Sequence, residues 1–384
     1  MIIENGLRER PLFVPFLCCD VIVTLAITSI FGCSASPVKP ATSPATSQSE
    51  AAVEDPASDQ TADEASGQAP EGAGEKIIPV AARRGAANNP LQPERAMGYL
   101  NSLCDLGPRP TGSKAMLAQQ ELISKHFEQL GGKVEWQRFR FRHPLQGTAV
   151  DAANLIVHWH PDAKERILLC AHYDTRPQPD NENVPAQERG HIFVGANDGA
   201  SGTALLMELA HFMPEVSGRY GVDFLLVDAE EFVFPGSTRK DRYFIGSEYF
   251  SRDYVASRNP YTYRKGAVLD MIGDRSLQIY QDRNSVWWRD TRPVTREIWS
   301  VADKLNIKEF IPKLHPHMKQ PIRDDHIMLH NIGKIPTCEI IDFDYPKYPI
   351  NRYWHTDEDT PQKCSGESLA KVGWVMLEWL KTAE

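Results

Sequence analysis

Acidic and histidine side chains follow the apolar runs of this chain, at the point where each run ends. His172 and Asp174 come directly after the run RILLCA, and Glu230 and Glu231 come shortly after the run VDFLLV. Imidazoles and carboxylates are ligands that zinc takes in proteins. Two adjacent carboxylates after a buried strand repel each other unless a cation or a shared proton offsets their charge. The pattern therefore predicts a metal site.

Three further segments carry residues of the same kinds. Asp198 lies within GANDGASG, immediately before a predicted helix, and Asp270 closes the run GAVLD. His355 lies in the motif WHT, after the last predicted strand. A single residue of these types is more often a helix cap or a solvated side chain than a ligand, so the prediction depends on the whole set. Two other histidine pairs are interpreted as structural or surface residues: His158 with His160, and His315 with His317.

Alternating helix-period and strand-period segments have to position these residues. Helices are predicted over 93–104, 115–130, 202–213, 292–305 and 367–381. Strands are predicted over 133–143, 153–160, 166–171, 222–227, 265–269 and 334–341. This order predicts a mostly parallel sheet with helices on both faces. Because ligands of open α/β sheets bind outside the carboxyl ends of the strands, the acidic and histidine residues are expected at one rim.

The charge of the chain is unevenly distributed. The net charge is −9, and residues 34–76 contribute −6 of it through eight acidic residues and two lysines. The sequence has no basic run of the kind that nucleic acid requires, so no nucleic-acid partner is expected. Residues 34–76 are rich in Ala, Ser and Pro and hold no aromatic residue, which is typical of a disordered acidic linker.

The N-terminus has the features of an export signal. Arg8 and Arg10 precede an apolar stretch over 11–32, which ends in IFGCS. That ending resembles a bacterial lipoprotein cleavage box and makes Cys33 the expected lipid anchor to a membrane. Asp20 inside the stretch weakens this interpretation, and the alternatives are a plain signal peptide or an uncleaved anchor.

These features predict an exported protein, either a bacterial lipoprotein or a periplasmic or secreted protein. The predicted organisation is a signal over 1–33, a linker over 34–76 and a zinc-dependent catalytic domain over 77–384.

The motifs of the chain, taken in order, resemble those of a known enzyme family. HYD, GANDGASG, DAEE, GSEYF, VLDMIG, DDH and WHT occur over about 91–380 in the order seen in zinc aminopeptidases and glutaminyl cyclases. The resemblance implies a single α/β sandwich domain with a central mixed, mostly parallel sheet flanked by helices. It also implies that Asp198, Glu231 and His355 bind zinc and that Glu230 is the general acid/base. Peptide or protein N-termini would then be the substrates.

The number of zinc ions separates the two branches of this family. His172 and Asp270 match positions that bind a second zinc in the aminopeptidases, and Asp174 is a further candidate beside them. In the cyclases one zinc suffices, and Asp270 resembles an aspartate that hydrogen-bonds within the active site. One zinc is expected here, and a second zinc is the alternative.

Three details of the sequence favour the cyclase branch. The segment DDH at 324–326 matches a cyclase segment in which the first aspartate, here Asp324, shares a proton with Asp270. Trp354 stands where aminopeptidases more often carry Tyr, and it would supply an apolar wall for a glutaminyl side chain. The stretch IIDFDYP resembles that of bacterial members called glutaminyl cyclases. The plain alternative for the DDH segment is that its aspartates cap a helix over 326–329.

One region departs from the animal cyclases, which carry a tryptophan a few residues after the acidic pair. Here that region reads FVFPG, so Phe232 and Phe234 are expected to contact the substrate, with core packing as the alternative. The predicted catalytic residues are Glu230, Asp270 and Asp324. The predicted reaction converts the N-terminal Gln of a peptide into pyroglutamate and releases ammonia. The alternatives are a two-zinc aminopeptidase and an inactive binding ectodomain of the same fold.

Overall fold

The computed structural model describes residues 88–234 and 242–384. All of them belong to the second of two units into which the chain divides, Pro79–Glu384. The predicted signal over 1–33, including Cys33, and the predicted linker over 34–76 lie outside the described residues. In the described part of the chain, every helix is too short or too polar to span a membrane.

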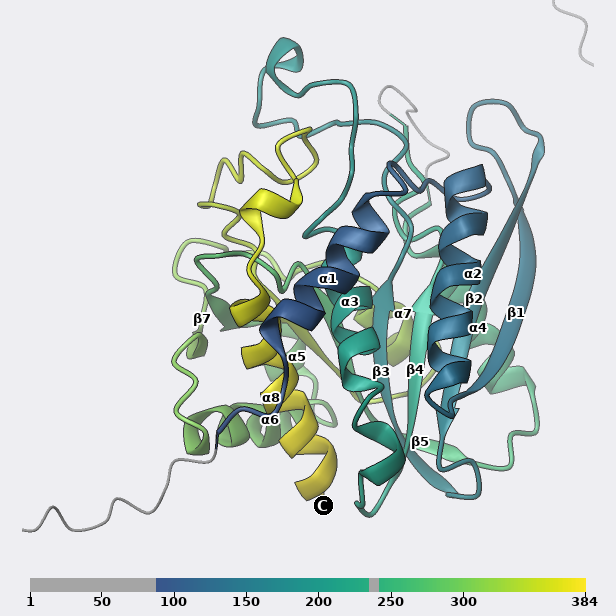
Figure 1. Cartoon of the computed structure of the whole chain (residues 1–384), viewed down its shortest axis with the longest axis vertical. Helices are drawn as coiled ribbons and strands as arrows, with labels where there is room; N and C mark the ends of the chain where they lie inside the picture. The colour runs from purple at the N-terminus through teal and green to yellow at the C-terminus, as the bar shows by residue number, and fades with distance from the viewer. Residues whose placement is uncertain (1–87, 235–241) are drawn as a thin grey trace, which may run out of the picture. The chain divides into compact units, whose positions relative to one another are not determined.

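A six-stranded mixed sheet forms the centre of the described unit (Figure 1). Its strands lie in the order β1-β2-β4-β3-β5-β8. The pairs β1–β2 and β2–β4 are antiparallel, whereas β4–β3, β3–β5 and β5–β8 are parallel. The bounds are β1 Lys133–Arg142, β2 Ala149–Trp159, β3 Glu165–His172, β4 Gly221–Val227, β5 Thr262–Asp270 and β8 Thr337–Ile341. A separate parallel pair consists of β6 Ile279–Gln281 and β7 Phe310–Leu314.

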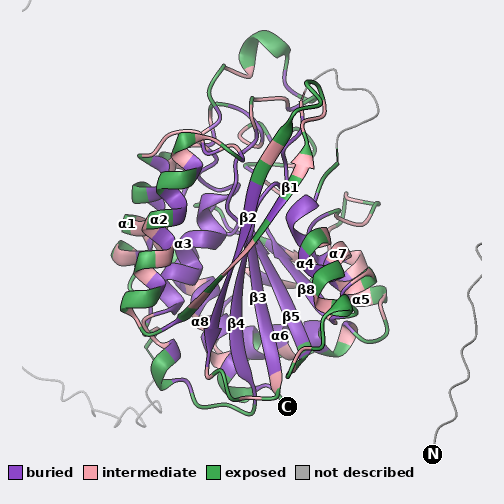
Figure 2. Cartoon of the chain, turned by 90° about the vertical axis from the view of Figure 1, so that its right-hand side faces the viewer, coloured by how far each residue is buried: buried purple, intermediate pink, exposed green. Residues whose placement is uncertain are grey.

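Helices cover both faces of the central sheet, with α1, α2 and α3 on one side and α4 and α7 on the other (Figure 2). The bounds are α1 Pro93–Cys104, α2 Lys114–Gln129, α3 Ala200–Leu209, α4 Ile245–Ala256, α5 Arg283–Trp287, α6 Arg292–Lys304, α7 His326–Asn331 and α8 Gly366–Thr382. Three short 3₁₀ turns are Ala186–Glu188, Met213–Glu215 and Pro361–Lys363. The predicted fold class, an α/β sandwich with a mixed and mostly parallel central sheet, is confirmed.

Strand residues point alternately to the two faces, which gives the unit two main cores. Leu155 and Val157 of β2 belong to the large core beneath α1, α2 and α3. Ile156 between them belongs to the smaller core beneath α4 and α7. β3 and β4 are buried along almost their whole length, as the runs RILLCA and VDFLLV predict. The carboxyl ends of these strands therefore meet at one rim of a well-packed sheet.

A side-chain cap begins one of the predicted helices. α2 begins after Ser113, whose hydroxyl accepts a hydrogen bond from the Met116 amide at 3.0 Å, so its N-terminus is capped. Each helix and strand predicted above is present, with ends shifted by a few residues. The elements α4, α5, β6 and β7 were not predicted. α4 lacks a start signal, because its N-cap residue is Phe244, which has a φ of 62° and no capping side chain.

Candidate active site

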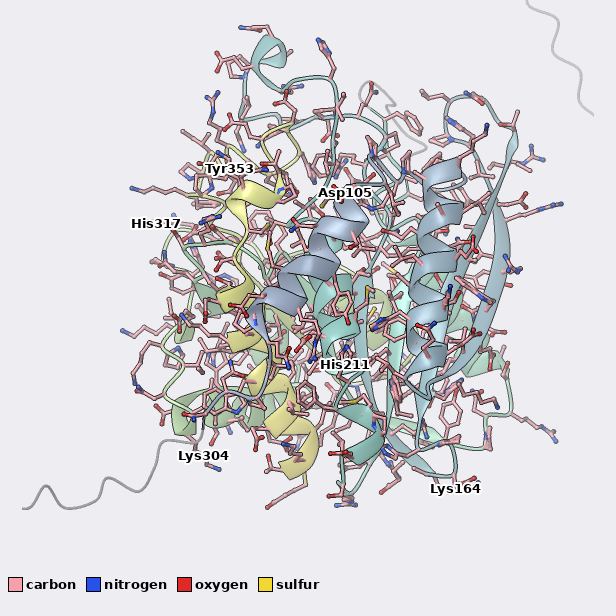
Figure 3. All side chains as sticks on the ribbon, viewed as in Figure 1. Asp105, Lys164, His211, Lys304, His317 and Tyr353 are labelled. Carbon is pink, nitrogen blue, oxygen red and sulfur yellow. The ribbon has the colours of Figure 1, made fainter. Side chains whose placement is uncertain are left out.

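The rim at the carboxyl ends of the parallel strands opens into a cavity of about 580 Å³. In Figure 3, Lys164 just before β3 lies at the lower end of the unit, and Tyr353 beside Trp354 lies at the upper end. Predicted site residues from five separate segments line the cavity: Asp198, Glu230, Glu231, Asp270, Asp324, Trp354 and His355. The structure thus brings most of the predicted set together at the rim where strand direction predicts it.

The three residues predicted to bind the expected zinc lie in mutual contact. Nε2 of His355 lies 3.3 Å from Oδ2 of Asp198 and 3.5 Å from Oε2 of Glu231. The other ring nitrogen of His355, Nδ1, lies 3.1 Å from Oδ1 of Asp180. A carboxylate on the far nitrogen fixes the orientation of a metal-binding imidazole, so Asp180 positions His355 for this role.

A second group of ligand types shares Asp198 with the first. Nε2 of His172 lies 3.2 Å from Oδ1 of Asp198 and 3.1 Å from Oδ1 of Asp270. Asp198 therefore carries one histidine on each carboxylate oxygen. His172, Asp198 and Glu231 each offer one ligand atom, and these three atoms lie within 4.8 Å of one another. The cluster can hold one ion or two.

Asp174 supports the acidic pair from below the cavity. Its carboxylate accepts hydrogen bonds from the Glu230 amide at 3.0 Å and from the Glu231 amide at 3.3 Å. The same carboxylate lies 3.8 Å from Nδ1 of His172. Because both of its oxygens are engaged by backbone amides, Asp174 is placed to position its neighbours rather than to bind an ion.

The buried charge of this cluster fits a cation. Oδ2 of Asp198 is buried and has no hydrogen-bond partner among the described residues. Burial and the nearby Asp198 charge raise the pKa of Glu231 well above its usual range. Carboxylates held this close in a buried site are costly without a compensating positive charge. The set of two imidazoles and several carboxylates matches the ligand types of zinc.

Three buried acids of the cavity are disposed to hold protons. Burial raises the pKa of Glu230 well above its usual range. Burial also raises the pKa of Asp324, and the charges of Asp270 and Asp325 add to that rise. The pKa of Asp270 is raised by burial despite a hydrogen bond to His172. Neighbouring acids that cannot all ionise share protons.

Asp325 does not cap the helix that follows it. It occupies the N-cap position of α7, but its side chain accepts no capping hydrogen bond. Instead its Oδ1 accepts a hydrogen bond from the Ser247 hydroxyl at 2.5 Å, which ties α7 to α4. The capping alternative is therefore not supported for this residue, and Asp324 faces the cavity.

Strained backbone lies next to the functional side chains. Ala229, Met271 and His355 have positive φ angles of 57°, 47° and 54°. Each is itself a predicted site residue or adjoins one. Non-glycine residues rarely adopt this conformation, and such strain concentrates at functional sites. Here the left-handed residues turn the chain sharply where β4 and β5 end.

Three supporting residues of the site were not predicted: Asp180, described above, and two more. Asp359 accepts hydrogen bonds from the amides of Asn197 at 2.8 Å and Asp198 at 3.1 Å, so it shapes the loop that presents Asp198. Arg176 donates from its backbone amide to Oε1 of Glu231 at 2.7 Å and from Nε to Oε2 at 3.1 Å. Arg176 and Asp359 lie just after motifs quoted above, since HYD is followed by TR and WHT by DED, but spacing alone does not distinguish them from solvated charges.

The aromatic residues divide between the cavity and the core. Trp354 lines the cavity and stacks on His355, with ring centroids 3.6 Å apart, as an apolar wall requires. Phe232 is buried in a small core cluster with Phe139, and Phe234 packs against that cluster. Neither phenylalanine is among the residues that line this cavity. The arrangement favours the core alternative for both.

Known proteins resemble this chain over nearly the whole described unit. The model of peptidase family M28 matches residues 154–380. The crystal structure of Fimbriiglobus ruber glutaminyl cyclase is 39% identical, covers 76% of this chain and 95% of its own, and has a TM-score of 0.69. The crystal structure of a leucine aminopeptidase precursor from Bacteroides thetaiotaomicron is 30% identical, covers 77% and 99%, and has a TM-score of 0.68. The glutaminyl-peptide cyclotransferase of Gloydius blomhoffii is 25% identical over 301 residues, which cover 71% of this chain and 77% of its own.

Proposed function

The chain belongs to peptidase family M28, and we propose that within this family it acts as a glutaminyl-peptide cyclotransferase. It converts the N-terminal Gln of a peptide into pyroglutamate and releases ammonia. The observation that carries the proposal is that one cavity holds three acids whose pKa values are raised by burial, Glu230, Asp270 and Asp324. A reaction that moves protons between two nitrogens needs such groups, and it needs no water as reactant.

Glu230 has the central role in the proposed mechanism. Its carboxylate takes a proton from the α-amine of the substrate, and the amine nitrogen attacks the carbonyl carbon of the Gln side chain, Cδ. Glu230 then donates a proton to the departing amide nitrogen, so the C–N bond breaks and ammonia leaves. Asp270 and Asp324 share a proton and keep Glu230 supplied. Trp354 covers one side of the glutaminyl group and excludes water.

Asp198, Glu231 and His355 are the residues proposed to hold the zinc. A zinc bound there would polarise the γ-carbonyl and stabilise the negative charge that develops on its oxygen. Asp180 and Asp359 would keep the ligands in place, through His355 and through the Asp198 loop. The support for zinc is the group of ligand atoms from His172, Asp198 and Glu231, which lie within 4.8 Å of one another, together with Nε2 of His355, which lies 3.3 Å from Asp198 and 3.5 Å from Glu231.

A two-zinc aminopeptidase is the second candidate function. It is favoured by His172, whose Nε2 lies within 3.2 Å of both Asp198 and Asp270. In that reaction Glu230 would activate a water for attack on the first peptide bond. The third possibility, an inactive binding ectodomain, has no support because every predicted ligand and acid is present in the cavity or directly beneath it.

One assay separates the two enzymes. The purified protein is incubated with two peptides that differ solely in their first residue, Gln or Leu, and the products are weighed by mass spectrometry. Loss of one ammonia from the Gln peptide, with the Leu peptide intact, supports the cyclotransferase. Removal of the first residue from either peptide supports the aminopeptidase and overturns the proposal.

We also propose that the protein is exported and lipidated at Cys33. The support is the apolar stretch over 11–32 and its ending IFGCS. The mass of the protein isolated from membranes should include a lipid on Cys33 as the first residue. A soluble protein cut elsewhere would contradict lipidation.

A further inference from the structure

The β1–β2 hairpin carries the sheet beyond the active-site rim. The last pair between β2 and β4 joins Leu155 to Leu226, one residue before β4 ends. β2 begins at Ala149 and still pairs with β1 there, so the hairpin overhangs the rim by about 15–20 Å. Figure 1 shows this hairpin extending at the upper right beyond β3 and β4. Its tip is therefore on the same side of the sheet as the cavity that holds Glu230.

A second cavity, of about 500 Å³, lies at the base of this hairpin tip. We call it the basic cavity, because its lining includes Arg140, Arg142, His143 and Arg242 and contains no Asp or Glu among the described residues. The first cavity, in contrast, is lined by seven acidic residues, among them Glu182. The two cavities thus have opposite charge.

Apolar rings form the rest of the basic cavity. Phe141 and Phe232 both line it, with ring centroids 5.4 Å apart and nearly perpendicular. His143 meets Phe232 edge to face at 5.3 Å. A ligand for this cavity needs negative charge together with an apolar part. An acidic peptide segment with an aromatic or aliphatic side chain has both.

Two of the three arginines of the basic cavity are available to such a ligand, whereas Arg242 pairs with Glu248. Arg142 donates to the Gly147 carbonyl at 3.1 Å and has no carboxylate partner among the described residues. Arg140 pairs with Asp151, but both side chains are about three-quarters exposed. Exposed pairs of this kind contribute little and exchange readily for another carboxylate.

A wall one chain thick separates the two cavities. Glu231 lines the first and its neighbour Phe232 lines the second; Tyr243 lines the first and its neighbour Arg242 the second. The two cavities therefore meet at two pairs of consecutive residues. An extended peptide of three to five residues spans about 10–15 Å, the scale of a path from one cavity across this wall to the other.

We propose that the basic cavity binds acidic side chains of the substrate, three to five positions after its N-terminal Gln. This inference rests on the proposed function and names its preferred substrate class, peptides with an acidic segment close behind the cyclised residue. The Gln enters the acidic cavity while the following chain crosses the wall and reaches the arginines.

The test compares two peptides, Gln-Ala-Ala-Glu-Glu-Phe-Ala and the same sequence with both Glu replaced by Lys. The measured quantity is the ratio of their kcat/KM values for ammonia release, in which any loss of folded enzyme cancels. The ratio should favour the acidic peptide by about 3- to 10-fold, the scale of one or two exposed ion pairs. The effect should lie in KM and shrink in high salt.

Arg142→Glu should reverse this ratio. Arg138→Glu is the matched control, because Arg138 is also exposed on β1 but lies outside the basic cavity, over the Trp136 ring. The control should keep the preference of the unaltered protein. Equal kcat/KM values for the two peptides with the unaltered protein would overturn the proposal. The same shift of the ratio in Arg142→Glu and Arg138→Glu would also overturn it, because such a shift reports net charge alone.

Binding provides a readout that does not depend on cyclisation. The dissociation constants of the same two peptides, fluorescently labelled at the C-terminus, are measured by anisotropy. If no Gln peptide is cyclised but the acidic peptide still binds more tightly and Arg142→Glu removes the difference, the proposed function fails and the basic cavity stands. If Gln peptides are cyclised but the acidic peptide binds no more tightly than the Lys peptide, the proposed function stands and the proposed role of the basic cavity is rejected.

Discussion

Adjacent glutamates in this site have different surroundings, and their roles follow from them. Glu231 lies 3.5 Å from Nε2 of His355 and accepts from Arg176, so both of its oxygens are engaged by positive or donor groups. Glu230 faces the cavity, where burial raises its pKa, and its nearest basic group is Nδ1 of His172 at 4.0 Å. The first arrangement suits a metal ligand, and the second suits a group that takes up and releases a proton.

The two glutamates can be separated by isosteric substitution. Glu230→Gln should keep its zinc and lose about 10²- to 10⁴-fold in turnover, because a positioned acid/base is removed. Glu231→Gln should weaken zinc binding instead. Zinc content by metal analysis and the rate of ammonia release are measured on both variants. Loss of zinc from Glu230→Gln with retention in Glu231→Gln would reverse the assigned roles.

Substitution of Asp324 tests the proposed proton relay. Asp324→Asn keeps the size of the side chain but removes the shared proton, so ammonia release should fall sharply with zinc content unchanged. Asp325→Asn is the control, because Asp325 bonds Ser247 and does not line the cavity. The control should lower the melting temperature and reduce the activity of each folded molecule far less than Asp324→Asn does, because it removes only one of the charges that raise the pKa of Asp324. Full activity of Asp324→Asn would end the case for the relay.

At the scale of elements, α3 and the end of β5 set the spacing of the site. α3 follows the Asp198 loop directly, and Asp270 is the last residue of β5. Gly202 in the first turn of α3 lies against β5, where a Cβ would come within 2.2 Å of the Leu269 carbonyl oxygen and 2.9 Å of Ala171 Cβ. A glycine is needed here because the helix rests directly on backbone.

Gly202→Ala should therefore push α3 away from the sheet. The expected loss is about 1–3 kcal/mol in the free energy of unfolding, the usual cost of overpacking, together with weaker zinc binding. Gly98→Ala in α1 is the control, because a Cβ there meets nothing within 4 Å, and it should be neutral or slightly stabilising. Urea titrations of both variants check this. A Gly202→Ala protein as stable as the Gly98→Ala protein would contradict the close-packing argument.

At the scale of the whole molecule, the candidate metal centre joins parts of the chain that are far apart in sequence. Asp198 precedes α3, Glu231 follows β4, and His355 comes after β8. An ion held by all three would connect these segments across the rim. Because such an ion binds the folded chain and not the unfolded one, it would also raise the stability of the whole unit.

Removing zinc and then adding it back tests whether the ion stabilises the whole unit. A chelator should abolish activity and lower the melting temperature, and added zinc should restore both. We expect full activity at one zinc per chain, with the melting temperature rising further as free zinc exceeds its dissociation constant; at a 100-fold excess the gain is about 2.7 kcal/mol. A requirement for two tightly bound zinc ions would favour the aminopeptidase instead.

The sequence by itself determined which residues stand at the ends of strands. The runs RILLCA and VDFLLV are short, apolar and bounded, so they predict buried strands, and strand direction then places Asp198, Glu230 and Asp270 at one rim. These predictions hold because period and burial are local properties of the chain. The order of the motifs also predicts the family, and the comparisons with known proteins confirm it.

The tertiary structure alone decided which residues support the site and which rings face it. Asp359 holds the Asp198 amide across 161 residues of sequence, and Asp180 orients His355 from a loop without any periodic signal. Phe232 follows Glu231 directly, yet it lines the basic cavity whereas Glu231 lines the acidic one. Loop paths and side-chain directions depend on contacts between distant segments, and no local pattern in the sequence encodes those contacts.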